Sequence, residues 1–297
     1  MPQHGSIAYE VFGRLNAAAD NCVLVPSYYG GTSRSYLPLI GPGRALDPER
    51  FFIVLPNMLG NGVSNSPSNS REFQQASLAD NVHAQHALLN NLGVRRIALA
   101  YGWSMGAMQG FAWASLYPDM VRALLAVCGT AKCWPLNYVF LEGVKAAMGA
   151  GKKAFGRAYA GWAYSAAFYR EELWRGMGFA NLEDFLRFWE NDHEAQDARD
   201  LLAMLHTWQT AKAGPEDLTK ITARVIAMPC DTDMYFCPEE AAAEVAMIQN
   251  AELRVLTSPY GHCAGAPGRF TAETARVETA MRELLADIRM PPRQHHL

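Results

Sequence analysis

The chain has 297 residues, half of them hydrophobic, and 26 Lys and Arg against 29 Asp and Glu give a net charge of -3. This balance excludes disordered, collagen-like and disulfide-dense small proteins, and it offers no basic stripe for a nucleic acid. No segment approaches the roughly 18 continuous apolar residues of a membrane span, and the polar N-terminus shows no secretory signal. Because the six cysteines form no C-x-x-C pair, we expect reduced thiols in a cytoplasmic protein.

Short apolar runs alternate with helical patterns along most of the chain. The apolar runs are typical of strands buried on both faces of a sheet, and they cover residues 22–26, 51–55, 97–101, 124–128 and 224–228, with a weaker run at 252–257. The helical patterns cover residues 77–92, 104–117, 238–249 and 271–288. This alternation predicts an α/β protein with a doubly wound, mostly parallel sheet.

Residues 131–214 break the alternation, because they show no convincing strand and are helical in pattern and rich in large aromatics. We interpret this segment as a helical cap inserted into a core made of residues 1–130 and 215–297. A cap placed there would cover the C-terminal edge of the sheet, where open α/β sheets bind ligands. Most of its aromatics would pack its own core and a few would line an apolar pocket, while its exposed face could support a homodimer.

The motif Gly102-Trp103-Ser104-Met105-Gly106 follows one predicted strand and opens the next predicted helix. That context is typical of a nucleophile elbow, in which a sharp turn forces the serine to a positive φ. Side chains at positions 102 and 106 would collide with neighbouring elements, which accounts for the two glycines. The Met105 N–H, at the start of the helix, is expected to point where an oxyanion would form.

A serine nucleophile needs a base, and in this fold the acid and then the histidine follow the serine in the chain. His262 stands between the run at 252–257 and the last helix, which is the place for that base, and the remaining histidines fit less well. The acid should follow the strand that ends at Met228, where both Asp231 and Asp233 qualify. A metal site at these aspartates is a weak alternative because no His or Glu cluster accompanies them, so we expect no metal and no cofactor.

The second donor to an oxyanion normally comes from the loop after an early strand. Here that loop carries Tyr28 and Tyr29 before Gly30 and Gly31, and either tyrosine N–H is a candidate. The paired glycines would let the backbone approach the substrate, and a plain glycine turn is the alternative.

Several groups of residues on both sides of the cap resemble the homoserine O-acetyltransferase family of α/β-hydrolases. They are Ile40 to Leu46, Phe51 to Asn57 with Leu59 and Gly60, Ser104 to Gln109 with Trp113 and Tyr117 to Asp119, Asp231 to Asp233 with Phe236 and Pro238, and Tyr260 to His262. The resemblance implies the α/β-hydrolase fold and the triad Ser104, Asp233 and His262.

Three departures from that family fall near the expected site. Cys263 stands where the family usually has Asp, Lys145 where it has a substrate-binding Arg, and Trp103 where it has Gly. These changes remove charges that would bind a zwitterionic amino acid, because a lysine cannot replace the bidentate fork of an arginine. They favour a plain carboxylic ester hydrolase, whose substrate pocket we expect to be lined by Trp103, Trp134, Tyr138, Lys145 and Cys263.

The sequence therefore predicts a serine hydrolase that cleaves a small, largely apolar ester or amide through an acyl-Ser104 intermediate. Its expected partner is a small acyl substrate, with no nucleic acid and no membrane. The alternative is an acyl-CoA-dependent O-acyltransferase in which Lys145, Lys152, Lys153 and Arg157 meet the CoA phosphates. A non-catalytic ligand-binding module on the same fold is the third hypothesis.

Overall fold

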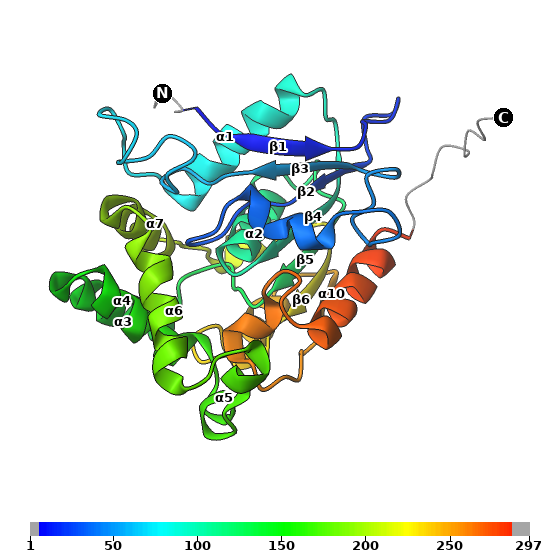
Figure 1. The fold of residues 1–297 in the computed structure, drawn as a ribbon. Helices are drawn as coiled ribbons and strands as arrows, with labels where there is room; N and C mark the ends of the chain where they lie inside the picture. The colour runs from blue at the N-terminus through cyan, green and yellow to red at the C-terminus, as the bar shows by residue number, and fades with distance from the viewer. Residues whose placement is uncertain (1–5, 287–297) are drawn as a thin grey trace.

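The computed structural model describes residues 6–286 and contains one seven-stranded sheet with the order β1-β3-β2-β4-β5-β6-β7 (Figure 1). Only β1 is antiparallel to its neighbour β3, and every other pair of adjacent strands is parallel. The predicted α/β class and mostly parallel sheet are confirmed. The strands are β1 (Tyr9–Phe12), β2 (Cys22–Leu24), β3 (Phe52–Pro56), β4 (Ile97–Trp103), β5 (Ala123–Val127), β6 (Arg224–Met228) and β7 (Ala251–Leu253).

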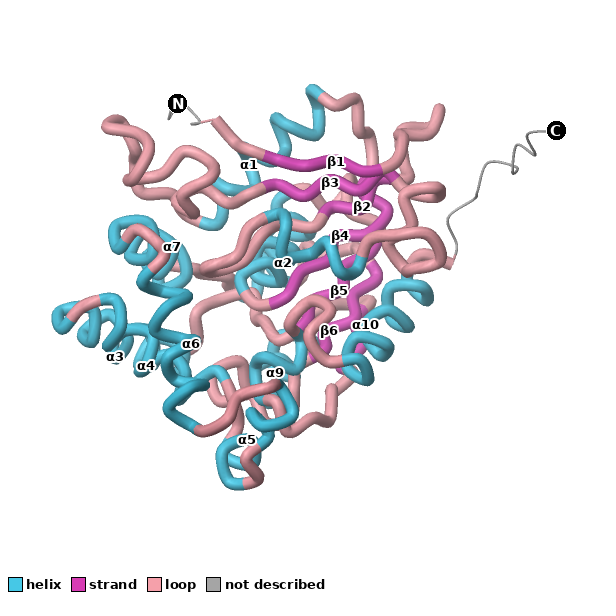
Figure 2. Tube along the Cα trace, in the orientation of Figure 1, coloured by secondary structure: helices cyan, strands magenta, loops and turns pink. Residues whose placement is uncertain are grey.

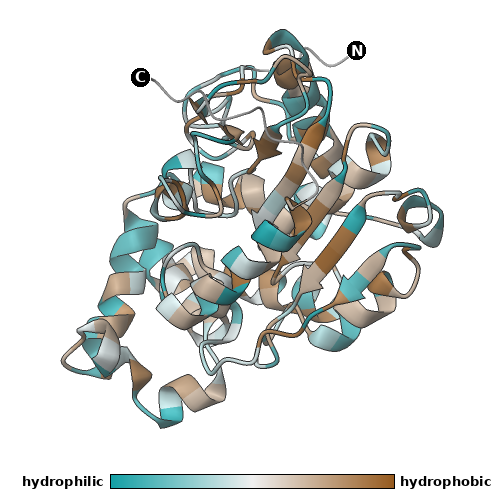
Figure 3. Cartoon of the chain, turned by 90° about the vertical axis from the view of Figure 1, so that its right-hand side faces the viewer, coloured by the Kyte–Doolittle hydropathy of each residue, from teal (hydrophilic) through white to brown (hydrophobic). Residues whose placement is uncertain are grey.

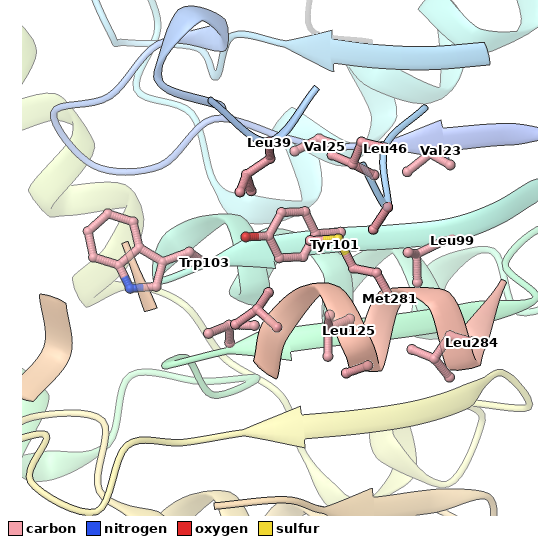
Figure 4. Close-up of a cluster of buried hydrophobic side chains, with 14 of the residues drawn as sticks. Val23, Val25, Leu39, Leu46, Leu99, Tyr101, Trp103, Leu125, Met281 and Leu284 are labelled. Carbon is pink, nitrogen blue, oxygen red and sulfur yellow. The ribbon is translucent and has the colours of Figure 1, made fainter. Parts of the chain in front are cut away.

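Helices cover both faces of this sheet, which is why its central strands read as unbroken apolar runs. On one face lie α1 (Leu78–Asn91), α2 (Met105–Leu116) and α9 (Pro238–Val245). On the other face lie the 3-10 helix η1 (Ser33–Leu39) and the closing helix α10 (Thr271–Leu284). Figure 4 shows this second face, where Met281 and Leu284 of α10 pack over Leu99, Tyr101 and Leu125 of the sheet.

Four details differ from the sequence prediction. The edge strand β1 was not predicted, because its residues alternate between half-buried and exposed positions and form no apolar run. The run at 252–257 is strand only up to Leu253, and the helix expected at 238–249 ends at Val245. The last helix ends at Leu284, and the final two residues of its predicted range lie outside the described residues.

Between β5 and β6 the described chain forms helices and loops without a strand, as Figure 2 shows on the side where the parallel strands end. The helices are α3 (Pro135–Ala147), η2 (Met148–Ala150), α4 (Lys152–Ala163), α5 (Ala166–Arg170), η3 (Leu173–Met177), α6 (Leu182–Glu194), α7 (Ala198–Gln209) and α8 (Pro215–Leu218). Their aromatic core is continuous with residues of the sheet edge, including Tyr29, Met105 and Cys263. The division into a core and a cap at residues 131 and 214 stays a prediction.

Hydrophobic residues gather on the strands of the sheet, whereas the outer helices carry both hydrophilic and hydrophobic stretches (Figure 3). No helix within residues 6–286 has both the length and the apolar character needed to cross a membrane. All six cysteines are free thiols in the structure, four of them buried.

Candidate active site

Ser104 lies at the sharp turn between β4 and α2, with φ 57° and ψ -128°. A non-glycine residue at positive φ is strained and persists only where its surroundings hold it in place. The two flanking glycines create the room for that turn. A Cβ on Gly102 would lie 2.1 Å from the carbonyl carbon of Gly106, and a Cβ on Gly106 would lie 2.8 Å from the carbonyl oxygen of Pro26. The expected strand-turn-helix geometry is therefore present.

His262 is paired with Asp233, and both side chains are buried. His262 lies in the 3-10 helix η4 (Gly261–Gly265), and its Nδ1 is 2.8 Å from Oδ2 of Asp233. The other carboxylate oxygen of Asp233 accepts hydrogen bonds from the N–H groups of Tyr235 and Phe236, each at 3.1 Å. Because an ionised carboxylate only accepts, Nδ1 of His262 carries the hydrogen and Nε2 keeps a lone pair, the arrangement that a general base needs.

The structure separates the two aspartates that sequence spacing could not distinguish. Asp231 is exposed, and its carboxylate accepts from the N–H of Ser258 at 3.1 Å. Asp233 is 5% exposed and faces His262. The turn after β6 therefore presents only the second aspartate to the histidine.

Three aromatic rings pack against the imidazole of His262. The indole N–H of Trp103 donates to the carbonyl oxygen of His262 at 3.1 Å, and the two rings stack with centroids 5.0 Å apart. Phe236 stacks on His262 at 5.4 Å, and Tyr235 lies at 4.6 Å. The sequence placed Trp103 near the site but gave Tyr235 and Phe236 no role there, although both lie within three residues of Asp233.

Ser104 and His262 line one cavity of about 240 Å³ at the end of the sheet. Tyr28, Tyr29, Trp103 and Cys263 also line it, as predicted for the oxyanion loop and for part of the pocket. Among residues 6–286, no protein group accepts a hydrogen bond from the N–H of Tyr28 or Tyr29. Met105 is fully buried at the first position of α2, where a helix leaves its N–H without an intrahelical partner.

Three residues predicted to line the pocket lie elsewhere. The indole of Trp134 donates to the buried carboxylate of Glu244 at 2.9 Å. Tyr138 is exposed, and exposed Lys145 pairs with Glu142 at 3.2 Å on the same helix. All three lie on or just before α3, which turns these side chains away from the cavity. The helices between β5 and β6 contribute other lining residues that were not predicted, namely Tyr159, Ala163, Trp189, Asp192 and His193.

Burial keeps several groups at the cavity uncharged. It raises the pKa of Tyr29 and Tyr235 well above the usual value for tyrosine, so both hydroxyls stay protonated. Burial also raises the pKa of the Cys263 thiol, which opposes thiolate formation beside His262. The cavity wall is therefore neutral at these positions, while Asp192 and Arg269 place charged side chains elsewhere in the same wall.

The sequence profile of the α/β-hydrolase fold family matches residues 23–264. The chain belongs to the α/β-hydrolase fold family. An ethyl acetate hydrolase of Pseudomonas veronii is 33% identical over 289 residues, which cover 86% of this chain and 83% of that protein. The crystal structure of the acetyl esterase MekB superposes with a TM-score of 0.91 at 31% identity, covering 95% of this chain and 91% of that one.

Homoserine O-acetyltransferases are also similar to this α/β-hydrolase, in one case along 95% of this chain. The enzyme of Moorella thermoacetica is 36% identical over 158 residues, which cover 46% of this chain and 42% of that protein. The resemblance predicted from the sequence motifs is confirmed.

Proposed function

We propose that this protein hydrolyses small carboxylic esters, with acetyl esters preferred, through an acyl-Ser104 intermediate. The observation that carries the proposal is the pairing of His262 with Asp233, with His262 lining the same small cavity as the strained Ser104. The similarity to an ethyl acetate hydrolase and to an acetyl esterase over most of the chain supports the same reaction.

The proposed reaction uses Nε2 of His262 to remove the Ser104 proton while Oγ attacks the ester carbonyl carbon. Asp233 stabilises the resulting imidazolium, and the N–H groups of Met105 and of Tyr28 or Tyr29 bind the oxyanion. Collapse of the tetrahedral intermediate expels the alcohol, which takes the proton from His262. Water then attacks the acyl-serine with His262 again as base, which releases the acid and restores Ser104.

The size of the cavity limits the substrate. At about 240 Å³ it is smaller than the roughly 300–1,000 Å³ of typical drug-sized ligand sites. Aromatic side chains form much of its wall, including Tyr28, Trp103 and Tyr159. These features favour a short acyl group and a small alcohol.

The charges of the cap favour hydrolysis over transfer from acyl-CoA. Three of the four cations considered for CoA binding already have partners: Lys145 pairs with Glu142, Arg157 pairs with two glutamates, and Lys152 donates to two backbone carbonyls. A cluster of free cations for the CoA phosphates is therefore missing from this part of the described chain.

A panel of substrates tests the proposal. Purified enzyme should hydrolyse ethyl acetate and 4-nitrophenyl acetate, with kcat/KM falling as the acyl chain lengthens from acetyl to octanoyl. The Ser104→Ala variant should keep the melting temperature within a few degrees and lose turnover. Consumption of acetyl-CoA that depends on an added alcohol or amine and outpaces ester hydrolysis would overturn the proposal in favour of acyl transfer.

A further inference from the structure

His193 is a buried histidine of the cavity that the proposed reaction does not use. It lies in the last turn of α6 and is 3% exposed. Its ring packs between Phe155 and Trp189, with centroids 5.2 and 5.8 Å away. It lines the same small cavity as Ser104 and His262. A polar ring placed so deeply in an aromatic wall needs hydrogen-bond partners for both of its nitrogens.

One nitrogen of His193 has its partner within the helix. Nδ1 lies 2.9 Å from the carbonyl oxygen of Trp189, one turn earlier. A carbonyl only accepts, so Nδ1 carries the hydrogen of the neutral ring, and burial lowers the pKa of His193 and so favours that neutral form. The lone pair is then on Nε2, to which no donor in residues 6–286 forms a hydrogen bond. The ring therefore offers an acceptor to whatever occupies the cavity.

The neighbours of His193 suit a hydroxyl group. Asp192 lines the same cavity, with its carboxylate 3.7 Å from Nδ1 of His193, the nitrogen that faces Trp189. Tyr159 lines it too, with its ring centroid 5.6 Å from that of His193, and its raised pKa keeps its hydroxyl a donor. A ligand hydroxyl can donate to Nε2 and accept from a tyrosine at once, whereas an alkyl group would leave a buried acceptor without a donor.

We propose that His193 is the hydroxyl-binding group of the substrate cavity, and that the favoured substrates are small esters that carry a hydroxyl a few bonds from the reacting carbonyl. The inference rests on the proposed function, because Ser104 and His193 share the cavity. Both residues line one cavity of about 240 Å³, so a small ester that fills the cavity would contact both. The hydroxyl can come from the alcohol or from the acyl part, and the two are separated by experiment.

Two pairs of esters of equal size provide the test. 2-Hydroxyethyl acetate and propyl acetate differ only by a hydroxyl in place of a methyl group on the alcohol. Ethyl glycolate and ethyl propanoate differ in the same way on the acyl part. We expect the hydroxyl ester of at least one pair to exceed its partner about tenfold in kcat/KM, as one hydrogen bond to a buried neutral group provides.

Substitutions at position 193 connect that preference to the ring nitrogen. In His193→Asn the amide reaches about as far as Nδ1, so the contact with Trp189 is kept and the acceptor is lost. In His193→Gln the amide reaches about as far as Nε2 and can still accept. His206→Asn is the matched control, because His206 is an exposed histidine on the next cap helix, outside the cavity wall.

We expect the ratio of kcat/KM within the preferred pair to fall to about one in His193→Asn, to survive in part in His193→Gln, and to stay unchanged in His206→Asn. The ratio compares two substrates on one preparation, so partial loss of folded enzyme cancels. If the Asn variant does not fold, His193→Phe, which keeps the aromatic packing, replaces it with the same expected loss. Equal rates within both pairs for the wild type, or a preference that persists without the ring, would overturn the inference. Failure of the wild type to hydrolyse any of the four esters would instead contradict the proposed function.

Discussion

The pairing of Asp233 with His262 makes a sharp prediction for the substitution Asp233→Asn. The carboxylate accepts three hydrogen bonds, at 2.8 Å from His262 and at 3.1 Å from each of two backbone N–H groups. An asparagine can satisfy the two N–H groups only with its amide oxygen, which turns its NH₂ toward Nδ1 of His262. The NH₂ donates, so the imidazole must carry its hydrogen on Nε2 and can no longer accept the proton of Ser104.

We therefore expect kcat for 4-nitrophenyl acetate to fall on the order of 10⁴-fold, as in other serine triads with this change, which corresponds to about 5 kcal/mol of transition-state stabilisation. The matched variant is Asp231→Asn, since Asp231 is exposed and contacts Ser258 rather than the histidine. It should retain kcat within about threefold, because the amide oxygen can still accept from the N–H of Ser258 and the residue does not contact the histidine. Steady-state kinetics give kcat for both variants, and melting temperatures show whether each variant is folded. A larger loss in Asp231→Asn than in Asp233→Asn would refute this assignment of the acid.

Three further predictions follow from contacts around the site. Trp103→Phe keeps the stack on His262 but removes the indole N–H that its carbonyl accepts at 3.1 Å, so kcat/KM should fall about tenfold, and unchanged kinetics would contradict a positioning role. Burial raises the pKa of Glu244 from 4.5 in the unfolded chain to about 7 in the folded protein. The stabilisation that this residue contributes is therefore fully present below pH 4.5. The free energy of unfolding falls by roughly 3 kcal/mol as the pH rises through 7. In urea unfolding between pH 4.5 and 8, the free energy of unfolding of Glu244→Gln should not show this decrease with pH. A decrease equal to that of the wild type would exclude Glu244 as its source. Gly102→Ala should abolish the circular dichroism signal of folded protein, because a Cβ at this position has no room. On α3 a Cβ at Gly143 meets nothing within 4 Å, so Gly143→Ala should raise the free energy of unfolding by about 0.5–1 kcal/mol. Equal stability of the two variants would contradict the described turn at Ser104.

Elements could be predicted from the sequence where one local constraint, such as burial on both faces or a tight turn, determines the residue types. Strands β3, β4 and β5 are covered on both faces, so every position is apolar and the run is plain in the sequence. The turn at Ser104 needs two glycines at fixed positions, which a short motif records directly. The strand β1 pairs at the edge of the sheet, and half of its side chains are exposed. Its sequence therefore contains no apolar run from which a strand could be predicted.

The choice between candidate residues depended instead on contacts between distant segments. Asp231 and Asp233 both follow shortly after the end of β6 at Met228, so sequence position does not distinguish them. The backbone N–H groups of Tyr235 and Phe236 hold the carboxylate of Asp233, whose other oxygen faces His262. In the cap, Trp134 and Trp189 are both aromatics in helical patterns, and periodicity does not reveal which one faces the sheet edge. The structure places Trp189 in the cavity wall and Trp134 against Glu244.

The central claim is that Ser104 forms a covalent acyl intermediate, and trapping that intermediate tests it most directly. Incubation with a fluorophosphonate, followed by proteolysis and mass spectrometry, should place one phosphonyl adduct on the peptide that contains Ser104. Ser104→Ala should remain unlabelled at the same concentration. An adduct on a different residue, or full ester turnover in an enzyme that the probe leaves unmodified at Ser104, would contradict the account.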